Sequence, residues 1–206
     1  MSRNFEQSAV ATPEVALVGD PAPLGLAGFG ITTLLFGLVK TGILGSGAAG
    51  VSAGVLAIAL PFGGLAQLLA GMWAFKRGNT FAATAFTSYG AFWLSFYLLV
   101  NVFIPQMIAG KATTSDVTSF VATYELAWGV FTAYMFLASL AGARAVQLVF
   151  LLLALTFIVL AIGDYSVSTS IGKFGGWLAL ATAVAAIYAS FADVTNANFK
   201  RRILPT

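Results

Sequence analysis

The chain has 206 residues, of which 59% are hydrophobic and only 8% are charged. A soluble domain has roughly a quarter of its residues charged, so this chain cannot cover a water-facing surface. It contains no cysteine and no histidine, which excludes disulfides, thiolate chemistry, imidazole metal ligands and the commonest general base. We therefore expect no enzyme activity, no metal site and no cofactor. The basic residues behind the net charge of +3 are scattered, so a lipid bilayer is expected as a partner and nucleic acid is not.

Six long apolar runs predict six membrane-spanning helices, because one span needs about 20 mostly apolar residues. The runs cover residues 24–44, 51–75, 84–104, 120–140, 145–162 and 172–191. The gaps, at 45–47, 76–79, 111–119, 142–144 and 163–170, are short and polar or rich in glycine, so successive helices must be antiparallel neighbours. The expected fold is an all-α integral membrane protein with six transmembrane helices in a compact bundle.

The polar ends of the chain bound this helical domain. Residues 1–20 are predicted to form a flexible polar tail rather than a signal peptide, since no apolar segment follows a basic start. Residues 21–195 form the six-helix transmembrane domain, and residues 196–206 a basic C-terminal tail. Seven Lys and Arg residues fall on the side of the two tails and three on the other, which predicts that both termini are cytoplasmic in a multi-pass protein of the cell membrane.

Glycines are frequent in the first two spans, where small residues let helices approach closely. They are Gly25, Gly28, Gly30, Gly37, Gly54, Gly63, Gly64 and Gly71. Tight packing alone explains such a pattern, and a narrow pore between closely packed helices would use the same residues.

Polar side chains inside the expected spans are costly and tend to face a bundle interior or a wet path. Thr80, Thr84, Thr87 and Ser88 share one helical face in the third span. An aromatic stripe continues it, and further polar candidates lie in the first two spans: Tyr89, Trp93 and Tyr97, and Thr32, Thr33 and Gln67. Either the hydroxyls bond to their own helix and the aromatic rings pack, or the track lines a solute path that ends at an aromatic constriction.

The start of the first span offers a second way to receive a small anion. Pro21 and Pro23 preset the first helical turn, and a helix N-terminus holds an anion with its backbone amides. The candidate residues for this contact are Leu24, Gly25, Gly28 and Gly30.

Several sequence blocks, in order, closely resemble the acetate uptake transporter family, which includes bacterial succinate-acetate permeases and fungal ammonia/acetate exporters. The segment from Asp20 to Leu26 resembles the NPAPLGL signature of that family. The other blocks are Gly28-Phe29-Gly30, Thr32-Thr33, Gly63-Gly64-Leu65-Ala66-Gln67, Gly78-Asn79-Thr80-Phe81, Thr84-Ala85-Phe86-Thr87-Ser88-Tyr89-Gly90, Phe92-Trp93, Trp128-Gly129-Val130-Phe131-Thr132 and Gly142-Ala143-Arg144. The resemblance runs from about Asp20 to Pro205.

The resemblance implies a homo-hexamer in which each protomer has its own pore, closed by a hydrophobic constriction. The constriction residues would be Phe29, Tyr89 and Leu153. A position in the sixth span whose side-chain size affects passage of larger dicarboxylates corresponds to Ala186.

Two residues depart from the family pattern. Asp20 replaces the leading Asn of the signature, and as a helix cap its carboxylate would occupy amides that an anion would otherwise visit. Glu125 replaces an apolar residue of the bacterial permeases. We expect Glu125 either to face a wet vestibule or to couple a proton to carboxylate movement.

These features together predict membrane transport of acetate and possibly other small carboxylates, with succinate less favoured. The protein would act as an anion channel or as a permease linked to protons. The alternative is a channel for a small neutral solute such as urea, ammonia or undissociated acetic acid, which needs no groups that favour an anion.

Overall fold

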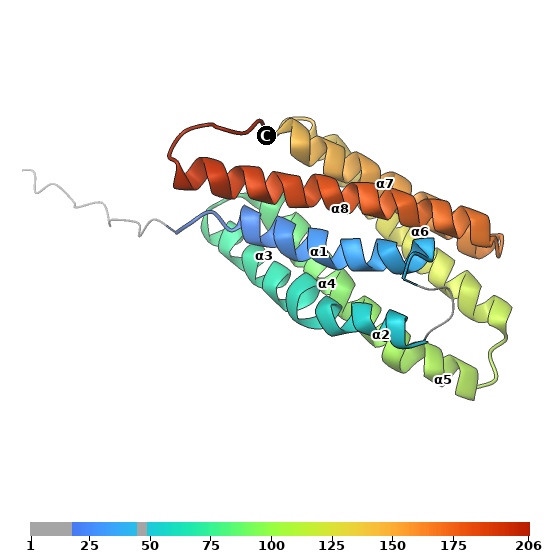
Figure 1. The fold of residues 1–206 in the computed structure, drawn as a ribbon. Coiled ribbons are helices and arrows are strands. Elements are labelled where there is room, and N and C mark those ends of the chain that lie inside the picture. The colour runs from blue at the N-terminus through green and yellow to red at the C-terminus, as the bar shows by residue number, and fades with distance from the viewer. Residues whose placement is uncertain (1–17, 45–48) are drawn as a thin grey trace, which may run out of the picture.

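The computed structural model describes residues 18–44 and 49–206, with side chains from residue 54 onward in the second range. The predicted loop at 45–47 and most of the N-terminal tail lie outside these residues. Over the described residues, six helical segments are long and apolar enough to cross a membrane, which confirms the expected all-α membrane fold. Figure 1 shows them as one bundle. The elements are α1 (Ala22–Thr41), α2 (Ala49–Ile58), η1 (Ala59–Ala66), α3 (Gln67–Lys76), α4 (Thr80–Leu98), η2 (Leu99–Phe103), α5 (Ile104–Ala109), α6 (Thr114–Ser139), α7 (Arg144–Tyr165) and α8 (Thr169–Asn198).

Several helices extend further than their apolar runs predicted. Helix α6 begins at Thr114 rather than near residue 120, because Thr113 and Asp116 form a capping box. Helix α8 begins at Thr169, where the Ser168 hydroxyl accepts a hydrogen bond from the Ile171 amide. The polar residues at these helix starts belong to helical turns, and an apolar run cannot reveal them.

Two spans contain a short π-helix next to a proline. The segment η1 includes Pro61, and η2 ends two residues before Pro105. Proline lacks the amide hydrogen and its ring clashes with the carbonyl four residues earlier in an α-helix. A wider turn removes that clash, so both spans continue through the proline instead of ending there.

The helices form a ring in which α1 packs closely on α8, α8 on α7, and α7 on α6, while α3 packs on α4. Small residues allow the contact between α1 and α8: a Cβ atom at Gly30 would lie 2.8 Å from Ile187 Cγ1, and one at Gly176 would lie 2.8 Å from the Thr41 nitrogen. Helices α4 and α6 approach each other much less closely. The ring therefore encloses an interior that is widest between α4 and α6.

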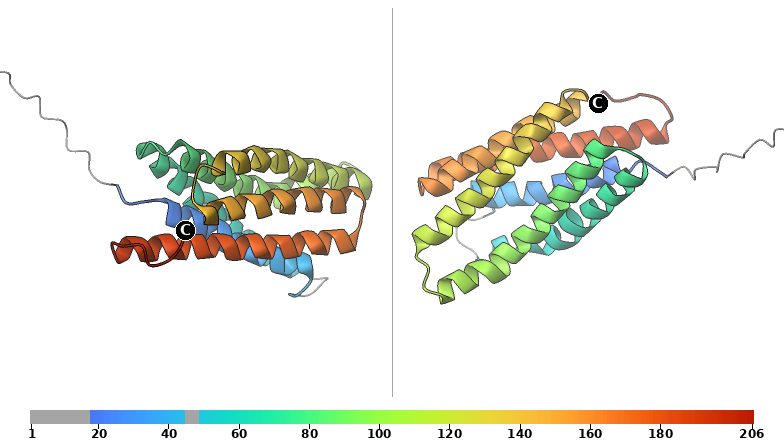
Figure 2. Two further views of the ribbon diagram at one scale, coloured as in Figure 1. Left: turned by 90° about the horizontal axis from the view of Figure 1, so that it is seen from above. Right: turned by 180° about the vertical axis from the view of Figure 1, so that it is seen from behind.

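The two ends of the bundle differ. We call the end where α1 begins and α8 finishes the terminal end, and the other end the opposite end (Figures 1 and 2). At the terminal end, the Asn196 side chain bonds to the backbone of Ile203 and Leu204, and Tyr188 donates to the Pro205 carbonyl. These bonds fold the last residues back onto α8.

We predict that Gly176→Ala destabilises the bundle, because its methyl group would meet the backbone of α1 and force the two helices apart. The cost should be about 1–3 kcal/mol, as for other overpacking substitutions. The apparent melting temperature of the detergent-purified protein measures this effect. Gly54→Ala is the matched control, since a Cβ atom there meets nothing within 4 Å among the described residues. An equal loss in both variants would contradict the packing role of Gly176.

Candidate functional site

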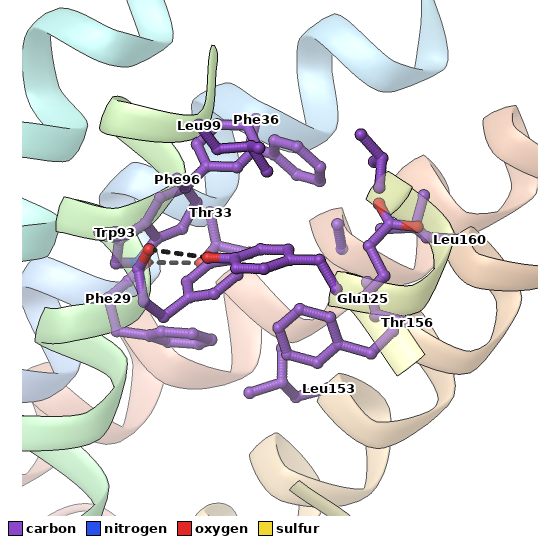
Figure 3. A pocket seen from close by; sticks show the side chains of 15 residues that line it. Phe29, Thr33, Phe36, Trp93, Phe96, Leu99, Glu125, Leu153, Thr156 and Leu160 are labelled. Atoms are coloured by element: carbon purple, nitrogen blue, oxygen red, sulfur yellow. Dashed lines mark hydrogen bonds between the residues drawn. The ribbon is translucent and has the colours of Figure 1, made fainter. Parts of the chain in front are cut away.

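A cavity of about 40 Å³ lies in the half of the bundle nearer the opposite end. We call it the chamber (Figure 3). Its walls come from α1, α4, α6, α7 and α8, together with η2, and are mostly aromatic and aliphatic. The lining residues are Phe29, Thr33, Phe36, Phe92, Trp93, Phe96, Leu99, Val121, Tyr124, Glu125, Leu153, Thr156, Phe157, Leu160 and Ala179.

A second cavity of about 340 Å³ occupies the terminal end, and we call it the inner vestibule. It lies among the starts of α1, α4 and α7 and the end of α6. Leu26, Phe86, Ser139, Phe150 and Asp193 are among its lining residues. It is much larger than the chamber.

The expected constriction residues lie between these two cavities. Phe29 and Leu153 line the chamber, and the ring of Tyr89 lies 5.7 Å from that of Phe29 and 6.0 Å from that of Phe150, which lines the inner vestibule. Phe29, Tyr89 and Leu153 are 4%, 3% and 4% exposed, respectively. The Tyr89 hydroxyl bonds to the Thr132 hydroxyl at 2.9 Å, which ties α4 to α6 at this level. The structure therefore brings the three residues together in one buried core.

Aromatic rings fill the space between α4 and α6. Phe92 of α4 stacks on Tyr124 of α6, with ring centroids 5.8 Å apart, and meets Trp128 edge to face at 5.2 Å. Tyr89 meets Phe131 in the same way at 5.4 Å. Sequence inspection missed Phe36, Phe92 and Phe96 as lining residues. The spacing of positions 89, 92, 93 and 96 on α4 was the available signal.

The polar candidates of the first two spans separate in the structure. Thr33 lines the chamber, but its hydroxyl donates to the Phe29 carbonyl at 2.7 Å. Thr32 lies against Gly63 of η1. Thr32 and Gln67 are 0% and 1% exposed, and the Thr32 hydroxyl and Gln67 Oε1 lack hydrogen-bond partners among the described residues. Of these three residues, Thr33 alone lies on the chamber wall.

The predicted hydroxyl track on α4, with Thr84, Thr87 and Ser88, lines neither the chamber nor the inner vestibule, and its role in a pathway stays a prediction. The cavities are lined instead by the neighbouring face of α4, with Ala82, Ala85, Phe86, Phe92, Trp93 and Phe96. Thr87 faces Gly71 of α3. Tyr97, at the end of the predicted aromatic stripe, lines neither cavity. The spacing correctly predicted a single helical face, but that face packs on a neighbouring helix.

The amides at the start of α1 are largely occupied. Asp20 Oδ1 accepts from the Ala22 amide at 3.0 Å, and the Gly25 amide donates to the Pro21 carbonyl at 3.0 Å. Proline at position 23 has no amide hydrogen, which leaves Leu24 as the one first-turn amide without a helical acceptor. Amides deeper in α1 bond within the helix.

The glycines of α1 are packing positions. A Cβ atom at Gly25 would lie 2.5 Å from the Phe86 ring, and one at Gly28 would lie 2.8 Å from the Phe62 carbonyl oxygen. These contacts favour the packing interpretation of Gly25, Gly28 and Gly30 over reception of an anion by their amides. Ala186 is fully buried on α8 in the same core as Phe29 and Leu153, but it does not line the chamber.

Glu125 lies on the chamber wall and is 7% exposed. Its charged neighbours are Lys40 and Asp164 at the opposite end. The described residues contain no group of three or more His, Cys, Asp or Glu side chains that could hold a metal ion. The chamber therefore presents one carboxyl group among mostly aromatic and aliphatic side chains.

Six membrane spans around two interior cavities are typical of a membrane channel or transporter. The model of the GPR1/FUN34/yaaH family matches residues 3–205, and the chain belongs to that family. This confirms the resemblance found in the sequence.

Named relatives are similar over most of the chain. The succinate-acetate/proton symporter SatP of Escherichia coli is 40% identical over 91% of this chain and 95% of its own length. Acetate permease A of Emericella nidulans is 34% identical over 98% of this chain and 70% of its own length. A solved structure of the bacterial acetate channel SatP covers 92% of this chain and 99% of its own, with a TM-score of 0.81 and 40% identity.

We predict that Phe92→Ala destabilises the protein by about 3–5 kcal/mol, the usual cost of removing a buried ring. Phe92 is 8% exposed and joins α4 to α6, whereas Phe103, on η2 of the same span, is 52% exposed. Phe103→Ala is therefore the matched control. Thermal unfolding in detergent measures both, and equal losses would show that the rings between α4 and α6 do not hold the bundle together.

Proposed function

We propose that this protein carries acetate across the cell membrane, through a pathway that joins the inner vestibule to the chamber within one protomer. The observation that carries the proposal is the buried cluster of Phe29, Tyr89 and Leu153 between the chamber and the inner vestibule. In the proposed function, these three residues form a barrier. Relatives named as acetate transporters and an acetate channel support the choice of solute.

The chamber favours a small monocarboxylate. A cavity needs about 10–15 Å³ to hold one water molecule, so about 40 Å³ suits a solute of a few heavy atoms such as acetate. Succinate, with twice as many heavy atoms, is a poorer fit. Ala186 would influence this size limit indirectly, through the packing of α8 around the barrier.

In the proposed topology, the terminal end faces the cytoplasm. Lys76, Arg77, Arg144, Lys200, Arg201 and Arg202 lie at this end, and Lys40, Lys111 and Lys173 at the opposite end. Such a surplus of basic residues is typical of cytoplasmic loops. We also propose a homo-hexamer, in which residues 21–195 form the transport domain of each protomer.

Uptake of labelled acetate into proteoliposomes tests the proposed function, with protein-free vesicles to subtract passive diffusion of acetic acid. We expect saturable uptake above that background. At equal acetate anion concentration and zero membrane potential, faster acetate uptake under an inward proton gradient would indicate proton-linked transport. An uptake rate that depends only on the acetate gradient and the membrane potential would indicate an anion channel. No saturable uptake would contradict the proposal and favour a neutral solute.

We predict that Tyr89→Ala widens the barrier, because it removes a ring that packs on Phe29 and a hydroxyl that bonds to Thr132. Uptake of larger carboxylates should rise relative to acetate uptake. The ratio of propionate to acetate uptake in proteoliposomes measures the change. Tyr134→Ala removes a tyrosine of α6 that is 51% exposed and serves as the control. An unchanged ratio of propionate to acetate uptake in Tyr89→Ala would contradict the assignment of Tyr89 to the barrier.

A further inference from the structure

Glu125 is the one acidic group among the described residues that line the chamber. It extends from α6 into the chamber wall, where aromatic and aliphatic side chains surround it (Figure 3). Its Oε2 atom has no hydrogen-bond partner among the residues that the structure describes. A buried carboxyl oxygen without a partner is costly, so this oxygen is available to a polar group that enters the chamber.

The hydroxyl groups of the chamber already have partners. Thr33 donates to the Phe29 carbonyl, and Thr156 donates to the Leu152 carbonyl at 2.8 Å. The Tyr124 hydroxyl bonds to the Ser95 hydroxyl at 2.7 Å and to the Phe92 carbonyl at 3.2 Å. Within the described part of the lining, Glu125 Oε2 and the Trp93 indole nitrogen are the buried side-chain atoms without a partner. A carboxylate that enters the chamber therefore meets Glu125 as its strongest available partner.

Glu125 also lies near the charged groups of a third cavity. Its neighbours Lys40 on α1 and Asp164 on α7 have Nζ and Oδ2 4.0 Å apart. Both line a cavity of about 300 Å³ at the opposite end, together with Lys173 of α8. Tyr124 is the adjacent titratable residue on α6 itself. Glu125 thus lies on the chamber wall with two residues of this polar cavity, Lys40 and Asp164, as its charged neighbours.

We infer that Glu125 makes the chamber a subsite for one carboxylate, in which the Glu125 carboxyl and the carboxylate of the transported solute share a single proton. This subsite rests on the proposed function. Two adjacent carboxylates cannot both stay ionised at low dielectric, and a hydrogen bond from a carboxyl to a carboxylate is short and strong.

The proton balance of the subsite is simple. Protonated Glu125 donates to the incoming acetate anion, and the proton moves to acetate as it leaves across the barrier as acetic acid. Glu125 remains as a carboxylate and regains a proton from the cavity at the opposite end. One proton therefore accompanies each carboxylate, and no net charge crosses the barrier. A dicarboxylate would place its second carboxylate against apolar walls, where removal from water is costly.

Two substitutions of Glu125 separate binding from proton transfer, using labelled acetate uptake into proteoliposomes. Glu125→Leu removes the donor, and the KM for acetate should rise about tenfold or more through loss of a charge-assisted hydrogen bond. Glu125→Gln keeps an N–H donor but no transferable proton. Its KM should stay within about threefold of wild type, since one hydrogen bond of similar geometry remains, while acceleration by an inward proton gradient disappears.

Asp116→Asn is the control, because it removes a carboxylate from the same helix at a position that is exposed and outside the chamber. This variant should keep the wild-type KM and proton response. Succinate should compete with labelled acetate at least about tenfold more weakly than unlabelled acetate does, given the cost of desolvating a second charge. Size-exclusion chromatography checks that each variant is folded.

The outcomes distinguish the subsite from the proposed function. If wild-type uptake is saturable but Glu125→Leu leaves the KM unchanged, or Glu125→Gln keeps its proton response, the subsite is wrong and acetate transport stands. Equal competition by succinate and acetate would also overturn the one-carboxylate subsite. If the wild type shows no saturable acetate uptake, the proposed function fails, and the subsite fails with it.

Discussion

Aromatic packing across the space between α4 and α6 sets the dimensions of the interior, and the barrier depends on it. On the other side of the ring, small residues bring α1 and α8 into close backbone contact. Lipid provides little hydrophobic drive for helix association, so the bundle relies on this shape complementarity. Glycines bring α1 and α8 close together, whereas aromatic rings such as Phe92 and Trp128 fill the wider space between α4 and α6.

In the proposed function, this arrangement produces a barrier between two cavities of different size. Phe29 and Leu153 close the chamber from the side of the inner vestibule, and the Tyr89 ring fills the space behind them. The barrier contains few free donors, since the Tyr89 hydroxyl is bonded to Thr132. A solute must lose water to cross it, so its charge matters as much as its size. In the proposed function, this constraint gives the single carboxyl of Glu125 its importance.

The fold was largely predictable from sequence, and the site only in part. Six apolar runs identify six spans, because the hydrocarbon thickness fixes the length of each helix. Helix ends such as Thr113 and Ser168 were missed, since capping residues are polar. The barrier residues came from family resemblance, and the structure brings them together.

The hydroxyl face of α4 shows why periodicity alone does not decide what a helical face contacts. A spacing that matches one helical face shows that Thr84, Thr87 and Ser88 point the same way, but not toward which neighbour. Here Thr87 faces α3 through Gly71, so this face lies outside the cavities. The same limit applies to Gly25 and Gly28, whose spacing suits a pore and a packing contact equally. Tertiary contacts of α1 decide between these roles.

The chain contains no cysteine, so single cysteines can test directly whether the two cavities are opposite sides of one closed pathway. Val121→Cys places a thiol in the chamber, and Val146→Cys places one in the inner vestibule. The control is Leu137→Cys, which changes a residue of α6 that is 65% exposed. An anionic thiol reagent that does not cross membranes should modify Val121→Cys from the opposite end and Val146→Cys from the terminal end, with acetate slowing both reactions. Modification of both cysteines from the same side, or no protection by acetate at either, would contradict a pathway closed at Phe29, Tyr89 and Leu153.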